Sequence, residues 1–163
     1  MIGQLTDGAW GTTVRAGIIG EIGCQSPWTD LEKTVMEGAI TAMAETGATL
    51  NVHPGRDQNQ PQEVAEFVAA RGGDLSRVVL SHIDRTIADQ DTLFRLADTG
   101  SVIEFDLFGQ EQSLYGLNLQ FDLPNDAIRL RMIRQLIDRG HLDQITISHD
   151  ICSVSYTHLR AHE

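Results

Sequence analysis

Five side chains able to bind a metal ion or transfer a proton recur along the chain. They are Glu21, His53, His82, Asp106 and Asp150, with successive spacings of 32, 29, 24 and 44 residues. Imidazoles combined with carboxylates are ligands that suit zinc, and also manganese, cobalt or iron. Burying so many ionisable groups without a partner is costly, and a divalent cation would satisfy them together. The competing interpretation is that each is a structural residue at the end of a strand.

Short apolar segments precede each of these five residues and are predicted to be strands buried on both faces. They cover residues 16–24, 48–53, 76–82, 101–106 and 143–150. Amphipathic segments between them are predicted to be helices over residues 29–47, 60–73, 87–100 and 124–140. Thr29 and Glu32 form a capping-box pattern at the first helix, and Gly47 marks its end.

The strict alternation of strand and helix predicts an α/β fold with parallel strands and helical crossovers. It leaves two architectures open, a doubly wound sheet and a (β/α)₈ barrel. The first strand is followed by "EIGCQSPWTD" and not by G-x-G-x-x-G, and the chain has no P-loop. One βα unit takes about 30 residues, so the five side chains return at the same level of successive units. In a barrel this level is the carboxyl-terminal face, where active sites lie.

Composition narrows the class of partner. The 163 residues suit one soluble globular domain, and a net charge of −11 with a pI near 4.8 argues against binding nucleic acid or an anionic membrane. Only two cysteines occur, Cys24 and Cys152, which favours a reducing compartment, so we expect a cytoplasmic protein. We see no signal peptide and no apolar run of about 18 residues.

Five motifs carry a family resemblance: "GIIGEIGC", "NVHPGR", "LSHIDRT", "EFDLFG" and "DQITISHD". In this order and spacing, from Ala16 to Cys152, the sequence resembles the phosphotriesterase-related branch of the amidohydrolase superfamily. The resemblance implies an α/β fold, a partial (β/α)₈ TIM barrel in which this chain supplies strands four to eight. We therefore expect an incomplete hydrolase barrel over residues 1–152. Residues 153–163 (SVSYTHLRAHE) depart from the family pattern, and we expect a non-native tail there.

The resemblance also implies roles for the five residues. Glu21 would be the carboxylate that bridges two metal ions, and His53 and His82 would be further ligands. Asp150 would bind the other ion and act as the catalytic proton carrier. Asp106 would line the substrate pocket.

Two residues on the predicted loops extend this pocket. Arg56 follows His53 and is assigned to the substrate pocket, where it could bind a carboxylate. Trp28 lies on the loop after Glu21 and could cover the site. For both residues a purely structural role stays open. Arg56 would then be a solvated arginine, and Trp28 would pack its own loop.

The implied function is hydrolysis of a lactone, amide or phosphoester bond by a hydroxide held between two divalent ions, with zinc favoured. The expected partner is a small-molecule substrate, without nucleic acid or membrane, and a homodimer is compatible with the chain. The alternative is an inactive truncated fragment, because the His-x-His pair on the first strand of the family does not occur in residues 1–163. A Schiff-base aldolase is excluded because the only lysine, Lys33, lies inside a predicted helix.

Overall fold

Five parallel strands form one curved sheet. The computed structural model describes residues 1–116, 119 and 122–151, so the predicted tail lies outside the described residues. Neighbouring strands in the sheet follow the chain, in the order β1-β2-β3-β4-β5. The strands are β1 (Ile18–Gly23), β2 (Thr49–His53), β3 (Val78–Leu80), β4 (Val102–Phe105) and β5 (Ile145–Ile147).

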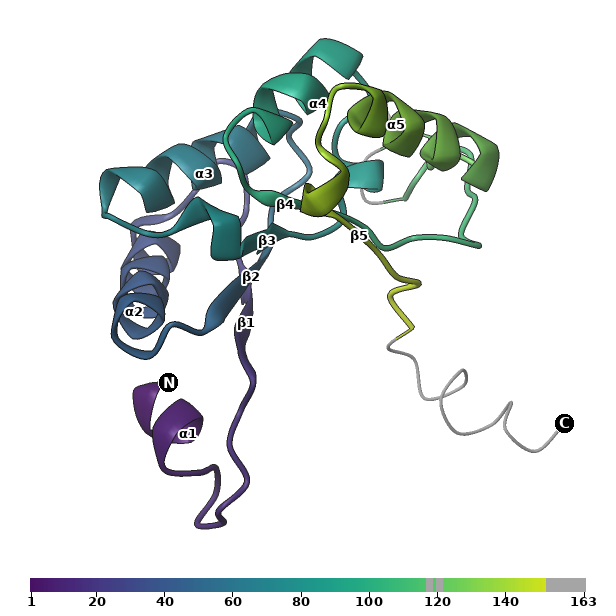
Figure 1. Cartoon of the computed structure of the whole chain (residues 1–163). Helices are drawn as coiled ribbons and strands as arrows, with labels where there is room; N and C mark the ends of the chain where they lie inside the picture. Colours follow the sequence, from purple (N-terminus) through teal and green to yellow (C-terminus); the bar gives the residue numbers. More distant parts are fainter. Residues whose placement is uncertain (117–118, 120–121, 152–163) are drawn as a thin grey trace, which may run out of the picture.

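Helices connect the strands and lie on the convex side of the sheet (Figure 1). They are α2 (Asp30–Thr46), α3 (Gln60–Ala70), α4 (Gln90–Ala97) and α5 (Asp126–Asp138), and a short helix α1 (Ile2–Thr6) packs against α2. This arc of β/α units confirms the predicted partial barrel. In the part of the chain that the structure describes, none of the helices has both the length and the apolar character needed to cross a bilayer.

Element boundaries differ from the sequence prediction where capping residues intervene. The 3₁₀ turns η1 (Leu75–Arg77) and η3 (Leu142–Gln144) take the first residues of two predicted strands. Helix α4 begins only at Gln90, because the side chain of Asp89 accepts a hydrogen bond from the backbone N–H of Thr92. A further 3₁₀ turn, η2 (Ile83–Arg85), follows β3. The capping box of α2 and the left-handed backbone of Gly47 are present as predicted.

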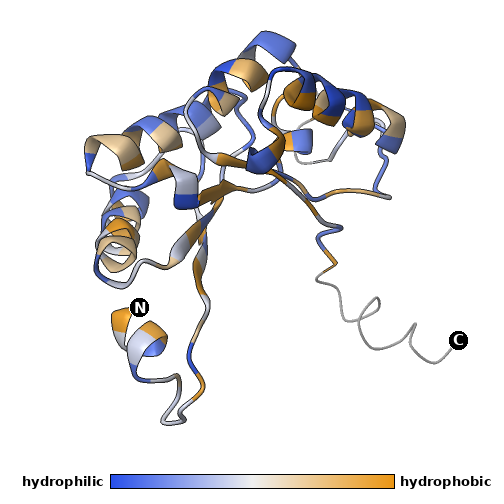
Figure 2. Cartoon of the chain, in the orientation of Figure 1, coloured by the Kyte–Doolittle hydropathy of each residue, from blue (hydrophilic) through white to orange (hydrophobic). Residues whose placement is uncertain are grey.

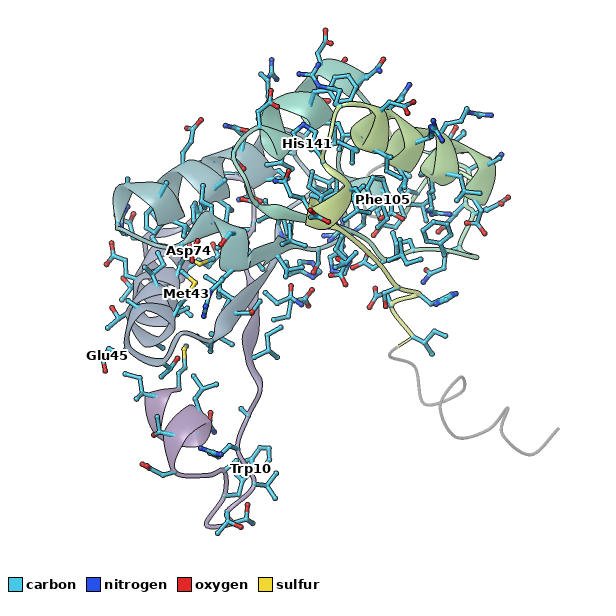
Figure 3. The ribbon with its side chains drawn as sticks, viewed as in Figure 1. Trp10, Met43, Glu45, Asp74, Phe105 and His141 are labelled. Carbon is cyan, nitrogen blue, oxygen red and sulfur yellow. The ribbon has the colours of Figure 1, made fainter. Side chains whose placement is uncertain are left out.

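The hydrophobic core lies between the sheet and the helices. Alternate strand residues such as Leu50, Val52 and Phe105 are fully buried there, and Figure 3 shows Phe105 on the side of β4 that the helices cover. Helix α2 contributes a stripe with the spacing of one helical face, namely Met36, Ala39, Ile40 and Met43. Figure 2 shows hydrophobic residues along the strands and on the helix sides that face them.

The concave face of the sheet is more exposed than the face that the helices cover. Its strand residues, including Asn51, His53 and Glu104, are half-buried. Burial on both faces was therefore a wrong prediction for this face. The physical reason is that the five strands form an open arc, and among the described residues no second layer of elements covers its inner side.

Candidate metal centre

Glu21 lies in a bulge of β1. Ile19 pairs with Leu50 and Ile22 pairs with Val52, so two residues of β1 face the single residue Asn51. A bulge of this kind turns a side chain away from the regular alternation of a strand. The preceding Gly20 has a φ of +122°, and a Cβ there would lie 2.4 Å from the carbonyl oxygen of Asn51. Only glycine fits, and the bulge places Glu21 inside β1 rather than at its end.

The next two strands, β2 and β3, each lead to a histidine. His53 is the last residue of β2, and His82 lies two residues beyond the end of β3. Their rings meet edge to face with centroids 4.4 Å apart, and Nδ1 of His53 lies 2.8 Å from Nε2 of His82. His82 has a left-handed backbone with φ of 58°, which is uncommon for a residue other than glycine. Such a strained conformation is often found at functional sites.

Glu21 faces both of these nitrogens. Its Oε2 lies 3.3 Å from Nδ1 of His53, and its Oε1 lies 3.0 Å from Nε2 of His82. The three residues thus offer one ligand atom each, all within 4.8 Å of one another. One carboxylate and two imidazoles form a donor set that fits a divalent ion of the zinc type. We name Glu21, His53 and His82 the ligand cluster.

Asp106 contacts His82 on the side of the ring away from Glu21. Its Oδ2 lies 2.8 Å from Nδ1 of His82 and also accepts a hydrogen bond from the backbone N–H of His82. A carboxylate in this position keeps the proton on Nδ1 and leaves the lone pair of Nε2 free for an ion. Burial, the largest influence, lowers the pKa of His82, but the contact with Asp106 outweighs it and the net pKa is raised.

The pKa of His53 is shifted in the opposite direction. Burial lowers it most, followed by the charges of His82 and Arg85. Arg85 lies 3.0 Å from Nε2 of His53 through its Nη2 atom, and it is only 3 % exposed. A neutral His53 is the form that can act as a metal ligand.

A buried ion pair fixes the loops behind the site, and its arginine is a residue that the sequence analysis missed. Oδ2 of Asp84 accepts hydrogen bonds from Nε of Arg129 at 2.7 Å and from the backbone N–H of Leu107. Burial raises the pKa of Asp84, although the hydrogen bond from Arg129 partly opposes this. Arg129 shares the inward face of α5 with Met132 and Leu136, so its helical spacing was the signal that could have revealed it.

A second missed residue, Gln60, joins the loops after β1 and β2. Its Oε1 accepts a hydrogen bond from the backbone N–H of Gly55, and its Nε2 donates one to the carbonyl of Gln25. The side chain is 2 % exposed. Nothing in the sequence distinguished this glutamine from others at the start of a helix.

The remaining predicted site residues lie outside the ligand cluster. Asp150 is exposed beyond the end of β5 and is not among the residues whose ligand atoms converge, because β1 and β5 are opposite edges of the sheet. Trp28 is buried and packs against Phe67 with ring centroids 4.7 Å apart. Arg56 is half-buried beside Tyr115. Their roles stay predictions.

The comparison with known protein families agrees with this geometry. The sequence model of the phosphotriesterase family matches residues 1–162. The chain belongs to the phosphotriesterase family. A phosphotriesterase-related protein of Nematostella vectensis is 46 % identical over 93 % of this chain, and an N-acetyltaurine hydrolase of Xenopus tropicalis is 42 % identical over the same share. The chain spans 43 % of the length of each of these two relatives.

Solved structures of the family show the same fold. The phosphotriesterase homology protein of Escherichia coli, solved with phosphate in its active site, superposes with a TM-score of 0.80 at 30 % identity. A phosphotriesterase-like lactonase of Deinococcus radiodurans gives a TM-score of 0.78 at 30 % identity. These matches cover 96 % and 91 % of this chain but only 50 % and 43 % of the solved chains.

Proposed function

We propose that the protein is a metal-dependent hydrolase whose divalent ion is held by Glu21, His53 and His82. The observation that carries the proposal is the convergence of one carboxylate and two imidazoles within 4.8 Å, with Glu21 in the bulge of β1 and the histidines at or just beyond the carboxyl ends of β2 and β3. Catalytic sites of β/α barrels lie at this end. We propose zinc as the metal. The second ion that the resemblance implies would need ligands in addition to this cluster.

The residues around the cluster have separable roles in this proposal. A bound divalent ion would lower the pKa of water and polarise the bond to be cleaved. Glu21 and the lone pairs of His53 and His82 would hold it, while Asp106 keeps the ring of His82 in the orientation and tautomer that ligation requires. Asp150 is proposed to carry the proton to the leaving group.

We propose an amide as the bond that is cleaved. Relatives that carry the name N-acetyltaurine hydrolase are 39–45 % identical to this chain, whereas the lactonase of known structure is 30 % identical. In the reaction, the oxygen of water bonds to the carbonyl carbon and the C–N bond breaks. The nitrogen takes up a proton, and a carboxylic acid and an amine are released. Lactones and phosphoesters are the alternative substrates.

A second candidate is a chain that binds an ion without turnover. The exposed position of Asp150, away from the ligand cluster, and the absence of His-x-His from the sequence favour it. The two candidates differ in catalysis but share the ligand cluster, so metal content and turnover must be measured separately.

The test measures metal by elemental analysis in the longest natural protein that contains this sequence. Glu21→Gln and His53→Ala are compared with Glu45→Gln, an exposed carboxylate on α2 (Figure 3). We expect loss of metal in the first two variants and retention in the control. Hydrolysis is then assayed with N-acyl amino acids, N-acyl sulfonates, lactones and paraoxon-like esters. Full turnover after chelation, or in His53→Ala, would overturn the hydrolase proposal, and metal retention without turnover would favour the second candidate.

A further inference from the structure

Arg85 is a buried cation without an acidic partner. Its side chain is 3 % exposed, yet among the described residues no carboxylate oxygen lies within 4.0 Å of its guanidinium. Its hydrogen bonds go to neutral acceptors, namely Nε2 of His53, the hydroxyl of Thr86 and the carbonyl of Pro54. Buried charges are normally paired, because removing an ion from water is expensive. The unpaired charge therefore indicates an anionic ligand.

A second arginine lies close by. Arg56 follows His53 by three residues and is half-buried, and its Nη2 lies 3.3 Å from the hydroxyl of Tyr115 on the loop after β4. The guanidinium carbon is 5.7 Å from the centre of the tyrosine ring. No salt bridge of Arg56 occurs among the described residues either. The two arginines are joined through one loop, because Nη2 of Arg85 lies 3.5 Å from the carbonyl oxygen of Pro54, two residues before Arg56.

From this arrangement we infer that Arg56 and Arg85, with the hydroxyl of Tyr115, form a subsite for an anionic group of the substrate. The inference rests on the proposed function and specifies its substrate class. The compound would carry a carboxylate or a sulfonate a short distance from the bond that is cleaved, because Arg85 touches His53 of the ligand cluster. Planar guanidinium groups bind such oxyanions with two parallel hydrogen bonds.

The chemistry of His53 links this subsite to metal binding. Nδ1 of His53 faces Glu21, so an ion held there would leave the proton of the neutral ring on Nε2. A protonated Nε2 cannot accept the hydrogen bond that Arg85 now donates to it. Metal binding should therefore leave one N–H group of Arg85 free to donate a hydrogen bond to an anion. We expect anions to bind more tightly to the metal-loaded protein than to the chelated protein.

The test compares three amides: N-acetyltaurine, N-acetyl-β-alanine and the uncharged N-[2-(methylsulfonyl)ethyl]acetamide. Charge-assisted hydrogen bonds predict that kcat/KM is about 10- to 100-fold higher for an anionic amide than for the neutral one. In Arg56→Met and Arg85→Met this ratio should fall toward one. The ratio should be retained in Arg71→Met, a surface arginine paired with Glu37. The two anionic amides show whether sulfonate or carboxylate is preferred.

Binding without turnover provides a second measurement. Methanesulfonate and acetate are titrated calorimetrically into the metal-loaded and the chelated protein at constant ionic strength. We expect binding that weakens on chelation and in Arg56→Met. Because Arg85→Met could impair folding, Arg85→Lys serves as a variant that keeps the charge but loses the bidentate geometry, with an intermediate ratio expected.

The outcomes separate this inference from the proposed function. An unchanged preference in the arginine variants, or equal rates for charged and neutral amides in the wild type, would overturn the anion subsite while leaving the hydrolase intact. Absence of metal and of turnover with every amide would instead count against the proposed function. Anion binding that persists in that case would still support the subsite.

Discussion

One carboxylate oxygen, Oδ2 of Asp106, contacts both the ring and the backbone of His82. It lies 2.8 Å from Nδ1 and 3.2 Å from the backbone nitrogen. Because both contacts converge on one oxygen, Asp106 fixes the side chain of His82 and its left-handed backbone together. The orientation of the most buried member of the ligand cluster therefore depends on a residue that is not itself in the cluster.

The first prediction is that Asp106→Asn weakens metal binding by about 10- to 100-fold, the usual effect of losing a carboxylate behind a histidine ligand. The amide is a weaker acceptor for the Nδ1 proton, so the ring loses both its orientation and part of its basicity. The measurement is competition for zinc with a fluorescent chelator. Asp91→Asn, at an exposed site on α4, is the control. Unchanged affinity would show that Asp106 does not position His82.

The second prediction concerns the stability of the metal-free protein. The pKa of His82 is raised in the folded state, so its protonation stabilises the fold below about pH 6.5, and this contribution is lost as pH rises through the folded value. Asp106→Asn removes the main cause of the raised pKa. The difference in free energy of unfolding between wild type and variant should therefore be larger near pH 5.5 than near pH 8.5.

Denaturant titrations of the chelated protein at several pH values measure this difference. A difference that grows as pH rises would contradict the assigned contact between His82 and Asp106.

The third prediction concerns the buried pair of Asp84 and Arg129, whose side chains are both 0 % exposed. Arg129→Met leaves a buried carboxylate without its cation and should lower the free energy of unfolding by about 3–5 kcal/mol. Asp84→Asn combined with Arg129→Met should cost less than Arg129→Met alone, because no unpaired charge remains. Denaturant unfolding measures both, with the exposed Arg131→Met as control. A double variant less stable than Arg129→Met would argue against this account.

The fold and the ligand cluster follow largely from local pattern. Alternating strands and helices require parallel pairing, and the ends of parallel strands meet at one edge, so Glu21, His53 and His82 had to lie near one another. The glycine inside the isoleucine-rich segment of β1 was a visible sign of a bulge. The start of α4 could also have been predicted correctly, because Asp89 is a typical N-cap residue.

Contacts between distant residues could not be predicted in the same way. The helical spacing of Arg129 indicates that it faces inward, but it does not identify Asp84, 45 positions away, as its partner. The burial of Arg85 without an acidic partner could not be predicted from the sequence, because it is a property of the folded chain. Asp150 resembles the other strand-end residues in sequence, but its distance from them depends on how far the arc of strands closes.

The fourth prediction is that Cys24 is unreactive in the folded protein. Burial raises the pKa of its thiol to about 12, so at pH 8 only about one molecule in ten thousand carries the reactive thiolate. In a Cys152→Ser background, iodoacetamide should modify Cys24 rapidly in guanidinium chloride and very slowly without it. Mass spectrometry follows the reaction. Equal rates under both conditions would show that the loop after β1 is not closed over the thiol.

The fifth prediction tests whether the bulge in β1 places Glu21. A Cβ at Gly20 would meet the carbonyl oxygen of Asn51 at 2.4 Å, and the φ of +122° is unfavourable for any other residue. Gly20→Ala should therefore lower the free energy of unfolding by about 1–3 kcal/mol and weaken metal binding through displacement of Glu21.

The matched control for Gly20→Ala is Gly38→Ala, on the exposed face of α2, where nothing lies within 4 Å of the added methyl group. This change should raise stability by about 0.5–1 kcal/mol, because alanine is the better helix former. Chelator competition and denaturant unfolding are measured for both variants. A Gly20→Ala protein with wild-type stability and zinc affinity would mean that regular pairing in β1 can present Glu21 equally well. A loss of zinc affinity without a loss of stability would instead locate the effect in the bulge itself.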